Sequence, residues 1–227
     1  MFDRWRDRLA YAGLGIVLGV IAMVIFPSTL DGAVPLSGWS VFDEAKTQVA
    51  GSTVKVLIGG GHGSGTHIGN GYIVTAAHVT DGAKGIKVKG DTGLIVDAEL
   101  LWQNTAYDVA LLRIKEVDRF SASPMSCRSP DVGEEVTAKG NPLALEFITT
   151  KGRIAGSVRQ VGPWKTVVVV DLTIVQGNSG GGLFDKDGNL VGVNVGLMVS
   201  HVGLSPSLVP VTYAVPASTV CYLMARA

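Results

Sequence analysis

The sequence predicts an all-β protein, built as a sandwich or as barrels. From Thr53 onward, ten or more apolar runs of four to eight residues follow one another, and Gly, Pro, Asn or Asp separates them. Runs of this length that are rich in β-branched side chains are typical of strands. Glycine makes up 30 of the 227 residues, nearly twice the usual share of about 7%, as many tight turns would require.

Composition excludes two broad classes of protein. Hydrophobic residues account for 47% of the chain and charged residues for 17%, against a usual charged share of about 25%. Such a chain is too apolar to be intrinsically disordered. The 19 basic and 19 acidic residues balance, which argues against nucleic acid as a partner, because phosphate binding needs a basic surface.

Besides the strands, the sequence predicts a linker, a connection between two β halves and a terminal helix. Residues 27–40 are rich in turn formers and are expected to be a linker. Residues 116–134 are polar and turn-rich, and would separate two β halves of similar size. Ala217–Arg226 is expected to close the chain as one short helix. The expected strands include Thr53–Ile58, Gly71–Thr75, Gly85–Lys89, Asp108–Ile114, Glu135–Ala138, Phe147–Thr150, Arg153–Val158, Thr166–Asp171, Asn189–Val195 and Thr212–Val215.

An apolar segment near the N-terminus predicts a transmembrane helix. Residues 9–26 contain 18 residues without a charge, which as a helix would span about 27 Å, close to the ~30 Å bilayer core. Arg4, Arg6 and Arg8 precede it and the next basic residue is Lys46, so residues 1–8 are expected in the cytoplasm and the remainder outside, in the periplasm if the source is bacterial. A cleaved signal peptide and a buried core helix are the alternatives.

Three local patterns contain candidate catalytic residues. They are GYIVTAAHV, with His78 just after an apolar strand; YDVALLRI, with Asp108 opening a strand; and GNSGGGLF, with Ser179 among glycines. Taken singly, each has a plain structural explanation: a histidine at a strand end, an aspartate in a turn and a glycine-rich turn. Together they supply a nucleophile, a base and a carboxylate, which is the set that activates a serine.

The chemistry explains why these residue types belong together. Serine is a poor nucleophile at neutral pH and needs a base within hydrogen-bond reach, for which imidazole is suited. A carboxylate then holds the imidazole in the correct tautomer. The chain order is His, Asp, Ser, with gaps of 30 and 71 residues, which is the chymotrypsin order and not that of subtilisin or the α/β-hydrolases.

With these motifs the sequence resembles the trypsin-like serine proteases, most closely their HtrA/Deg branch. The resemblance covers about residues 41–225 and rests on TAAHV, DVALLRI and GNSGG, with softer matches at KGNPLALEFITTKGRIAG and VTYAVPAS. It implies a protease domain over residues 41–227 with two six-stranded antiparallel β-barrels, chymotrypsin-like. It also implies that His78 is the general base, Asp108 its orienting partner and Ser179 the nucleophile, with Gly177, Asn178 and Ser179 forming the oxyanion hole. The family's C-terminal PDZ domains have no counterpart in this sequence, so we expect a protease domain without one.

The same resemblance implies substrate contacts. The residue six before the nucleophile lies at the base of the S1 pocket in this fold, and here it is Thr173 rather than an aspartate. Asn194, Val195 and Gly196, on the strand after the active-site hairpin, would line one wall. A basic P1 side chain then lacks a counter-charge, so we expect small or medium aliphatic P1 residues.

Further expectations come from single residues. Some trypsin-like proteases bridge the terminal helix to the inter-barrel connection, which would pair Cys127 with Cys221 in a disulfide; two separate thiols are the alternative. Trp39 and Phe42 resemble, loosely, the aromatic N-terminal segment that supports a trimer in HtrA-like proteins, so a homotrimer is expected, with simple packing onto the first barrel as the alternative. His62 and His67 are interpreted as solvated loop histidines rather than metal ligands, and no metal site is expected.

These expectations combine into one hypothesis. The chain would be a membrane-anchored serine endopeptidase that acts on extracytoplasmic protein or peptide substrates through an acyl-enzyme on Ser179, without a cofactor. Two alternatives stay open. One is a catalytically silent binding or chaperone module that keeps the protease fold, and the other is a non-proteolytic acyl hydrolase that uses the same three residues.

Overall fold

The computed structural model describes residues 49–202 and 205–227, all within one structural unit, Ser40–Ala227. The expected cytoplasmic residues 1–8, transmembrane residues 9–26 and linker residues 27–40 lie outside the described part, as do Trp39 and Phe42. Among the described residues, no helix is both long and apolar enough to cross a bilayer.

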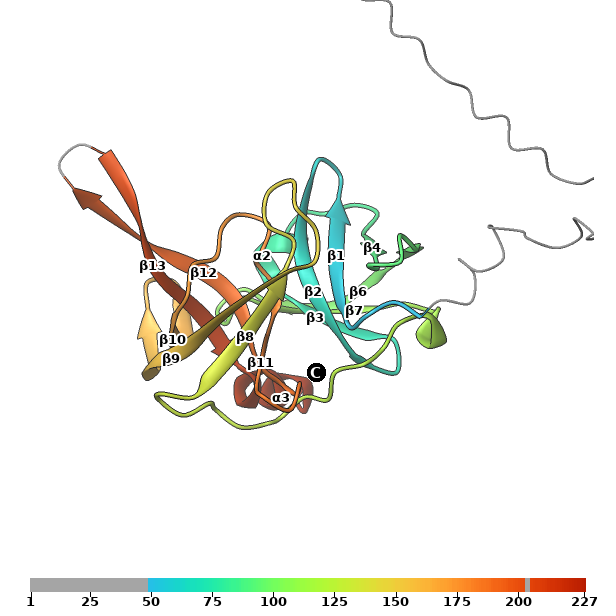
Figure 1. Ribbon diagram of the computed structural model, residues 1–227. Coiled ribbons are helices and arrows are strands. Elements are labelled where there is room, and N and C mark those ends of the chain that lie inside the picture. Colours follow the sequence, from blue (N-terminus) through green and yellow to red (C-terminus); the bar gives the residue numbers. More distant parts are fainter. Residues whose placement is uncertain (1–48, 203–204) are drawn as a thin grey trace, which may run out of the picture. The chain divides into compact units, whose positions relative to one another are not determined.

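The first half is a seven-stranded antiparallel sheet (Figure 1), in the order β5-β4-β1-β2-β3-β7-β6. Side chains along β1 alternate as a half-buried strand requires: Val54 and Val56 are fully buried, while Lys55 points the other way and pairs with Glu146. The strands are β1 (Thr53–Ile58), β2 (Gly61–Gly69), β3 (Tyr72–Thr75), β4 (Lys87–Lys89), β5 (Ile95–Asp97), β6 (Glu99–Asn104) and β7 (Val109–Arg113).

The prediction of a closed six-stranded barrel is wrong for this half. One chain segment, Ile95–Asn104, is divided at Ala98, whose amide donates to the Ile86 carbonyl at 2.9 Å. The part before Ala98 pairs with β4 and the part after it pairs with β7. The two ends of the sheet, β5 and β6, are therefore joined by chain continuity instead of a ladder of hydrogen bonds, and the half-barrel stays open.

The second half is a closed six-stranded barrel, in the order β10-β13-β12-β11-β8-β9, as predicted. Val136 and Ala138 on β8 face its interior, and exposed Glu135 and Lys139 alternate with them. Beyond the barrel, β12 and β13 continue as a long two-stranded ribbon (Figure 1). The strands are β8 (Glu135–Gly140), β9 (Ile148–Val161), β10 (Trp164–Asp171), β11 (Gly182–Phe184), β12 (Leu190–Val202) and β13 (Ser205–Pro216).

Three short helices complete the described chain. α2 (Ala77–Thr80) directly follows β3, and η1 (Val117–Arg119) starts the connection between the halves. The expected terminal helix is α3 (Ala217–Met224), which buries Ala217 and Val220. It packs against β12 and β13 of the second barrel.

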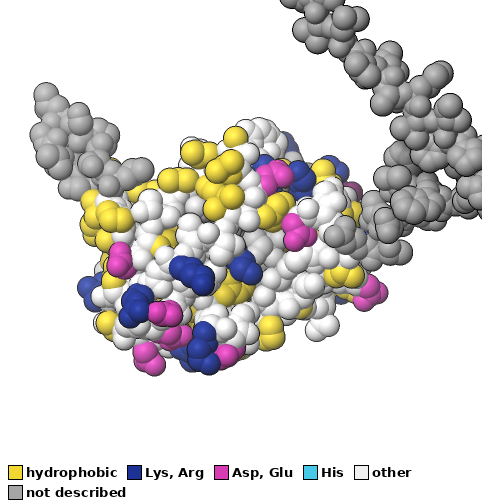
Figure 2. Space-filling model, in the orientation of Figure 1, with side chains coloured by type: hydrophobic (Ala, Val, Ile, Leu, Met, Phe, Trp, Pro, Cys, Tyr) yellow, Lys and Arg dark blue, Asp and Glu magenta, His cyan; other side chains and the backbone are white. Residues whose placement is uncertain are grey.

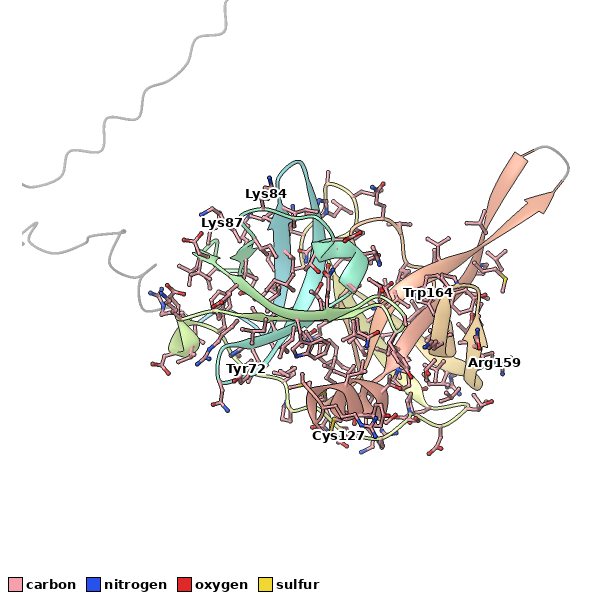
Figure 3. All side chains as sticks on the ribbon, turned by 180° about the vertical axis from the view of Figure 1, so that it is seen from behind. Tyr72, Lys84, Lys87, Cys127, Arg159 and Trp164 are labelled. Carbon is pink, nitrogen blue, oxygen red and sulfur yellow. A yellow bond between two sulfur atoms is a disulfide. The ribbon has the colours of Figure 1, made fainter. Side chains whose placement is uncertain are left out.

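The connection between the halves is tied to α3 by a disulfide. Cys127 and Cys221 are bonded, with their Cα atoms 5.7 Å apart, and Figure 3 labels Cys127 beside α3. The Ser129 and Ser218 hydroxyls, 2.9 Å apart, form a hydrogen bond at the same contact. The connection is therefore fixed at its far end and not only where it leaves the first sheet.

His67 corrects the interpretation of the glycine-rich segment. It lies inside β2 and is only 2% exposed. Its Nδ1–H donates to the Ser121 carbonyl at 2.9 Å, and the Gly71 amide donates to its Nε2 at 3.2 Å. His62 is also in β2 and is half-buried. Neither residue is a solvated loop histidine, because the glycines of this segment form a strand rather than a loop.

We expect the double substitution Cys127→Ser and Cys221→Ser to lower the free energy of unfolding. The bond joins residues with a sequence separation of 94. Removal of a native disulfide typically lowers the free energy of unfolding by about 2–4 kcal/mol. Urea unfolding measures the difference. Ser218→Ala keeps the disulfide and serves as the control, with an expected loss of about 1 kcal/mol. Equal unfolding free energies for wild type and the double variant would contradict the prediction.

Candidate active site

Strand register brings His78 and Asp108 together. β3 and β7 are antiparallel neighbours, and Thr75 at the end of β3 pairs with Ala110 at the start of β7. His78 comes three residues after Thr75, in α2, and Asp108 comes two residues before Ala110. Because β3 ends where β7 begins, His78 and Asp108 both lie at the same end of these two neighbouring strands.

The two side chains are hydrogen-bonded. His78 Nδ1–H donates to Asp108 Oδ2 at 2.7 Å, and the His78 backbone N–H donates to Asp108 Oδ1 at 2.9 Å. The histidine side chain is 48% exposed and the aspartate side chain only 9%. The bond fixes the tautomer, which leaves Nε2 of His78 as the nitrogen available to a substrate-side partner.

The electrostatics favour a charged Asp108. Its burial would raise the pKa of the carboxyl, but the hydrogen bonds donated by the His78 ring, the His78 backbone and Trp164 outweigh that effect and hold the pKa below its ordinary value of 3.8. The carboxylate is therefore ionised throughout the neutral range. In that state it can accept the Nδ1–H bond and stabilise an imidazolium.

Ser179 lies in the loop between β10 and β11, where its backbone is held by both halves. Its carbonyl accepts the Ser64 amide of β2 at 2.8 Å, and the next amide, that of Gly180, donates to the Asn194 carbonyl of β12 at 2.7 Å. Gly180 has φ of +83°, and a Cβ there would lie 2.2 Å from the Ser64 carbonyl oxygen. Only glycine fits this position.

Ser179 also lies close to the His78 segment. A Cβ placed on Gly63 would lie 2.6 Å from the Val79 side chain and 3.1 Å from the Ser179 carbonyl oxygen. The Gly63 backbone therefore lies between Val79, the residue after His78, and Ser179. The Ser179 hydroxyl makes no hydrogen bond to any described residue, so the candidate triad is hydrogen-bonded only between His78 and Asp108.

The backbone before Ser179 contains the predicted oxyanion hole. The Gln176 carbonyl accepts the Leu143 amide at 2.8 Å, so the Gly177 N–H at the other side of that peptide plane points away from Leu143. Neither Gly177 N–H nor Ser179 N–H donates to any described residue, whereas Asn178 N–H donates to the Val175 carbonyl at 3.1 Å. The two amides predicted to bind an oxyanion, those of Gly177 and Ser179, therefore have no acceptor among the described residues.

The loop that orients this peptide, residues 141–147, is anchored to the first half. Asn141 Nδ2 donates to the Val54 carbonyl at 3.1 Å, and His62 Nε2–H donates to the Asn141 carbonyl at 2.9 Å. Ser64 Oγ accepts the Asn141 amide at 2.8 Å and donates to the Gly177 carbonyl at 2.7 Å. The oxyanion peptide is thus held by a network that crosses between the halves.

A charged clamp holds the same loop. Lys89 Nζ lies 2.7 Å and Lys55 Nζ 2.9 Å from the two carboxylate oxygens of Glu146. Lys89, and then Lys55, hold the pKa of Glu146 below its usual range, so the clamp is intact at neutral pH and is lost only as pH falls through that lowered value. Leu143 and Leu145 of this loop are 58% and 60% exposed, and Figure 2 shows hydrophobic side chains gathered over this region.

The four predicted substrate residues are divided between two cavities. Thr173 and Asn194 line one of about 230 Å³, together with Asn178 and the apolar side chains of the 141–147 loop. Val195 and Gly196 line another of about 570 Å³, together with His78, Asp108 and Trp164. Asn194 is 1% exposed, and neither its Nδ2 nor its Oδ1 atom has a partner among the described residues.

Several site residues were missed by the sequence reasoning. Trp164 bonds to Asp108 of the candidate triad, and Ser64 bonds to the Gly177 carbonyl. Asn141 bonds to Ser64, and Glu146 pairs with Lys55 and Lys89. Asn141 lies within the GNP stretch that supported the resemblance, so that motif could have identified it. Glu146 lies in the same stretch as Asn141. Ser64 and Trp164 come from the distant strands β2 and β10 and carry no local signal. No group of three metal-ligating side chains occurs among the described residues.

The open sheet, the closed barrel and the residues between them define the class: this is the architecture of a trypsin-like peptidase. Residues 63–193 match the model of the trypsin-like peptidase domain, and the chain belongs to that family.

Relatives and solved structures agree with this assignment. A protein of Bartonella henselae named "Probable periplasmic serine endoprotease DegP-like" is 34% identical over 161 residues, which are 69% of this chain and 31% of that protein. The serine endoprotease from Yersinia pestis superposes with a TM-score of 0.67 at 28% identity, covering 82% of this chain and 65% of that one. A mutant, inactive form of Rv3671c from M. tuberculosis H37Rv, at 23% identity and a TM-score of 0.67 over 77% of this chain and 85% of that one, shares the fold. The chain thus spans less than a third of its DegP-like relative.

We expect Glu146→Gln to slow peptide hydrolysis and to make the rate insensitive to salt. Loss of both ion pairs loosens the loop that orients the Gly177 peptide. The resulting fall in kcat should be smaller than the ~10²-fold fall that follows removal of an oxyanion-hole donor. Salt screens the clamp in the wild type but has nothing to screen in the variant. Steady-state rates between low and high salt measure this effect.

Glu135→Gln is the matched control. It breaks an exposed pair with Arg153 on β8 and β9, outside the 141–147 loop. Its rate should follow the salt dependence of the wild type. Equal salt dependence in Glu146→Gln and wild type would contradict a role for the clamp.

Proposed function

We propose that the chain is a serine endopeptidase that hydrolyses peptide bonds through an acyl-enzyme on Ser179. The observation that carries the proposal is the pairing of a buried, ionised Asp108 with His78 at an edge that faces the Ser179 loop. Two free backbone amides beside Ser179 add to it. The alternative acyl hydrolase would use the same groups, but the family and its endoprotease-named relatives favour peptide substrates.

In this mechanism each group has a distinct task. His78 Nε2 takes the hydroxyl proton as Ser179 Oγ attacks the scissile carbonyl, and Asp108 stabilises the imidazolium that results. The Gly177 and Ser179 amides bind the oxyanion. His78 then gives the proton to the leaving amine, and water releases the acyl group by the same steps in reverse order. The chemistry requires no cofactor.

We further propose that the peptidase domain works outside the cytoplasm on protein substrates. Residues 9–26 would anchor it to the membrane, since the 18 uncharged residues and the preceding arginines favour that topology. The periplasmic relatives are consistent with this location. A homotrimer built on the segment that contains Trp39 and Phe42 remains part of the proposal, and size-exclusion chromatography with light scattering tests it.

A fluorophosphonate probe tests the catalytic assignment directly. We expect the purified chain to be labelled at Ser179, located by mass spectrometry, and Ser179→Ala to be unlabelled, because labelling needs both an activated nucleophile and an oxyanion hole. Ser126→Ala, on the inter-half connection, is the control and should label like the wild type. A folded wild type that resists the probe would contradict the proposal and favour a silent binding or chaperone module.

We expect cleavage to be fastest after small or medium aliphatic P1 residues. The cavity of about 230 Å³ beside Ser179 is lined by Ala138, Ile148 and Val175 and has Thr173 rather than a carboxylate. A panel of peptides that differ only at P1 measures kcat/KM, and valine should exceed arginine about tenfold or more. Thr173→Asp should move the preference toward basic residues. Fastest cleavage of arginine or lysine peptides by the wild type would overturn this assignment.

A further inference from the structure

Asp108 accepts a third hydrogen bond, from a residue outside the candidate triad. Trp164 Nε1–H donates to Asp108 Oδ2 at 3.0 Å. This is the same oxygen that accepts His78 Nδ1–H at 2.7 Å, while Oδ1 accepts the His78 amide at 2.9 Å. Two donors on one oxygen and one on the other fix the rotation of the carboxylate, and with it the plane in which the imidazole is held.

The bond joins the two halves of the domain. Trp164 is the first residue of β10 and follows the turn at Gly162, whose φ is +51°. The next residue, Lys165, donates its amide to the Ala106 carbonyl at 3.2 Å, two residues before Asp108. The start of β10 therefore holds the segment before β7 through both a backbone bond and a side-chain bond.

The indole ring is itself held in place. Its centroid lies 5.6 Å from that of the Tyr213 ring on β13. The ring also lies against Gly196, where a Cβ would be 2.3 Å from ring atom Cη2. Figure 3 labels Trp164 where the β12–β13 ribbon leaves the barrel. A ring confined between these neighbours has little freedom to turn its N–H away from Asp108.

No other side chain of the described residues takes over this task. His78 and Trp164 provide every hydrogen bond that Asp108 receives from described residues. Asn194 is nearly fully buried on neighbouring β12, yet both of its amide atoms lack a partner. Its amide therefore makes no bond to Asp108.

The ring also borders the larger cavity. Trp164, His78, Val195 and Leu197 line the space of about 570 Å³ in which a substrate side chain next to the scissile bond would lie. An apolar group there would exclude water from the indole–carboxylate bond, and such bonds strengthen when water is excluded. Occupancy of the cavity and orientation of Asp108 are thus physically connected through one side chain.

We propose that Trp164 is a positioning residue of the peptidase: its indole N–H orients Asp108, and hence His78, while its ring forms a wall of an apolar substrate subsite. This inference rests on the proposed function. It predicts that loss of the N–H reduces kcat, because the imidazole is less well oriented. It also predicts that loss of the ring raises KM for substrates with a large apolar side chain at this subsite.

The test separates the N–H from the ring. Trp164→Phe removes the donor and keeps an aromatic ring, and incorporation of benzothienylalanine at position 164 replaces the N–H by sulfur in a ring of nearly the same shape. Both should lower kcat about tenfold and move the acid limb of the pH profile to higher pH, since Oδ2 then keeps more charge to stabilise the imidazolium. Asp81, which lines the same cavity, is left unchanged in every variant.

Trp102→Phe is the control for loss of an indole, because Trp102 lies on β6 opposite Leu111 and gives no hydrogen bond to Asp108. It should keep the wild-type kcat and pH profile. A benzothienyl variant with the wild-type kcat and profile would overturn the proposal, and so would an equal loss in Trp102→Phe.

A second measurement does not require activity. In the Ser179→Ala background, NMR titration of the His78 ring should show a higher midpoint when Trp164→Phe is added. An unchanged midpoint would overturn the positioning role. A wild type that neither labels nor hydrolyses peptides would instead contradict the proposed function, so the two failures are distinguishable.

Discussion

Ser64 is the side chain on which the joining of the two halves most depends. It is fully buried on β2 of the first sheet, and its hydroxyl accepts the Asn141 amide and donates to the Gly177 carbonyl. Its backbone N–H donates to the Ser179 carbonyl. One serine of the first half thus contacts Gly177, Ser179 and the 141–147 loop. A buried hydroxyl whose bonds are all satisfied is costly to replace, because an apolar side chain would leave two backbone groups, the Asn141 amide and the Gly177 carbonyl, without that partner.

The rest of the site is assembled from strand ends. His78 follows β3, Asp108 precedes β7, Trp164 starts β10, and Asn194 to Gly196 lie on β12. Each sheet supplies rigid backbone, and the residues at its edge are fixed by register rather than by their own packing. Gly63 on β2 and Gly180 in the Ser179 loop allow these segments to approach closely, because a Cβ at either position would meet atoms of the facing segment.

Sequence reasoning predicted well what depends on local pattern. The apolar runs located most strands and the terminal helix, and the three motifs selected the residues that lie at the interface. It failed where the local structure depends on contacts with segments that are distant in the sequence. Glycines at 59–65 suggested a loop, yet pairing with β1 and β3 makes a strand there and buries His67. The break at Ala98 depends on a bond to Ile86, and Trp164 reaches Asp108 across 56 residues; neither contact leaves a mark in the sequence around it.

The contact between Trp164 and Gly196 couples two positions in evolution. The requirement for glycine at position 196 comes from the indole above it, not from the backbone, since Gly196 does not have a positive φ. A side chain becomes acceptable there only after residue 164 has become smaller, and that change also removes a donor from Asp108. Substitutions at positions 164 and 196 that change the shape of the subsite therefore also change the hydrogen bonding of Asp108. A descendant of this chain with a narrower cleft must find another donor for Asp108 or accept slower chemistry.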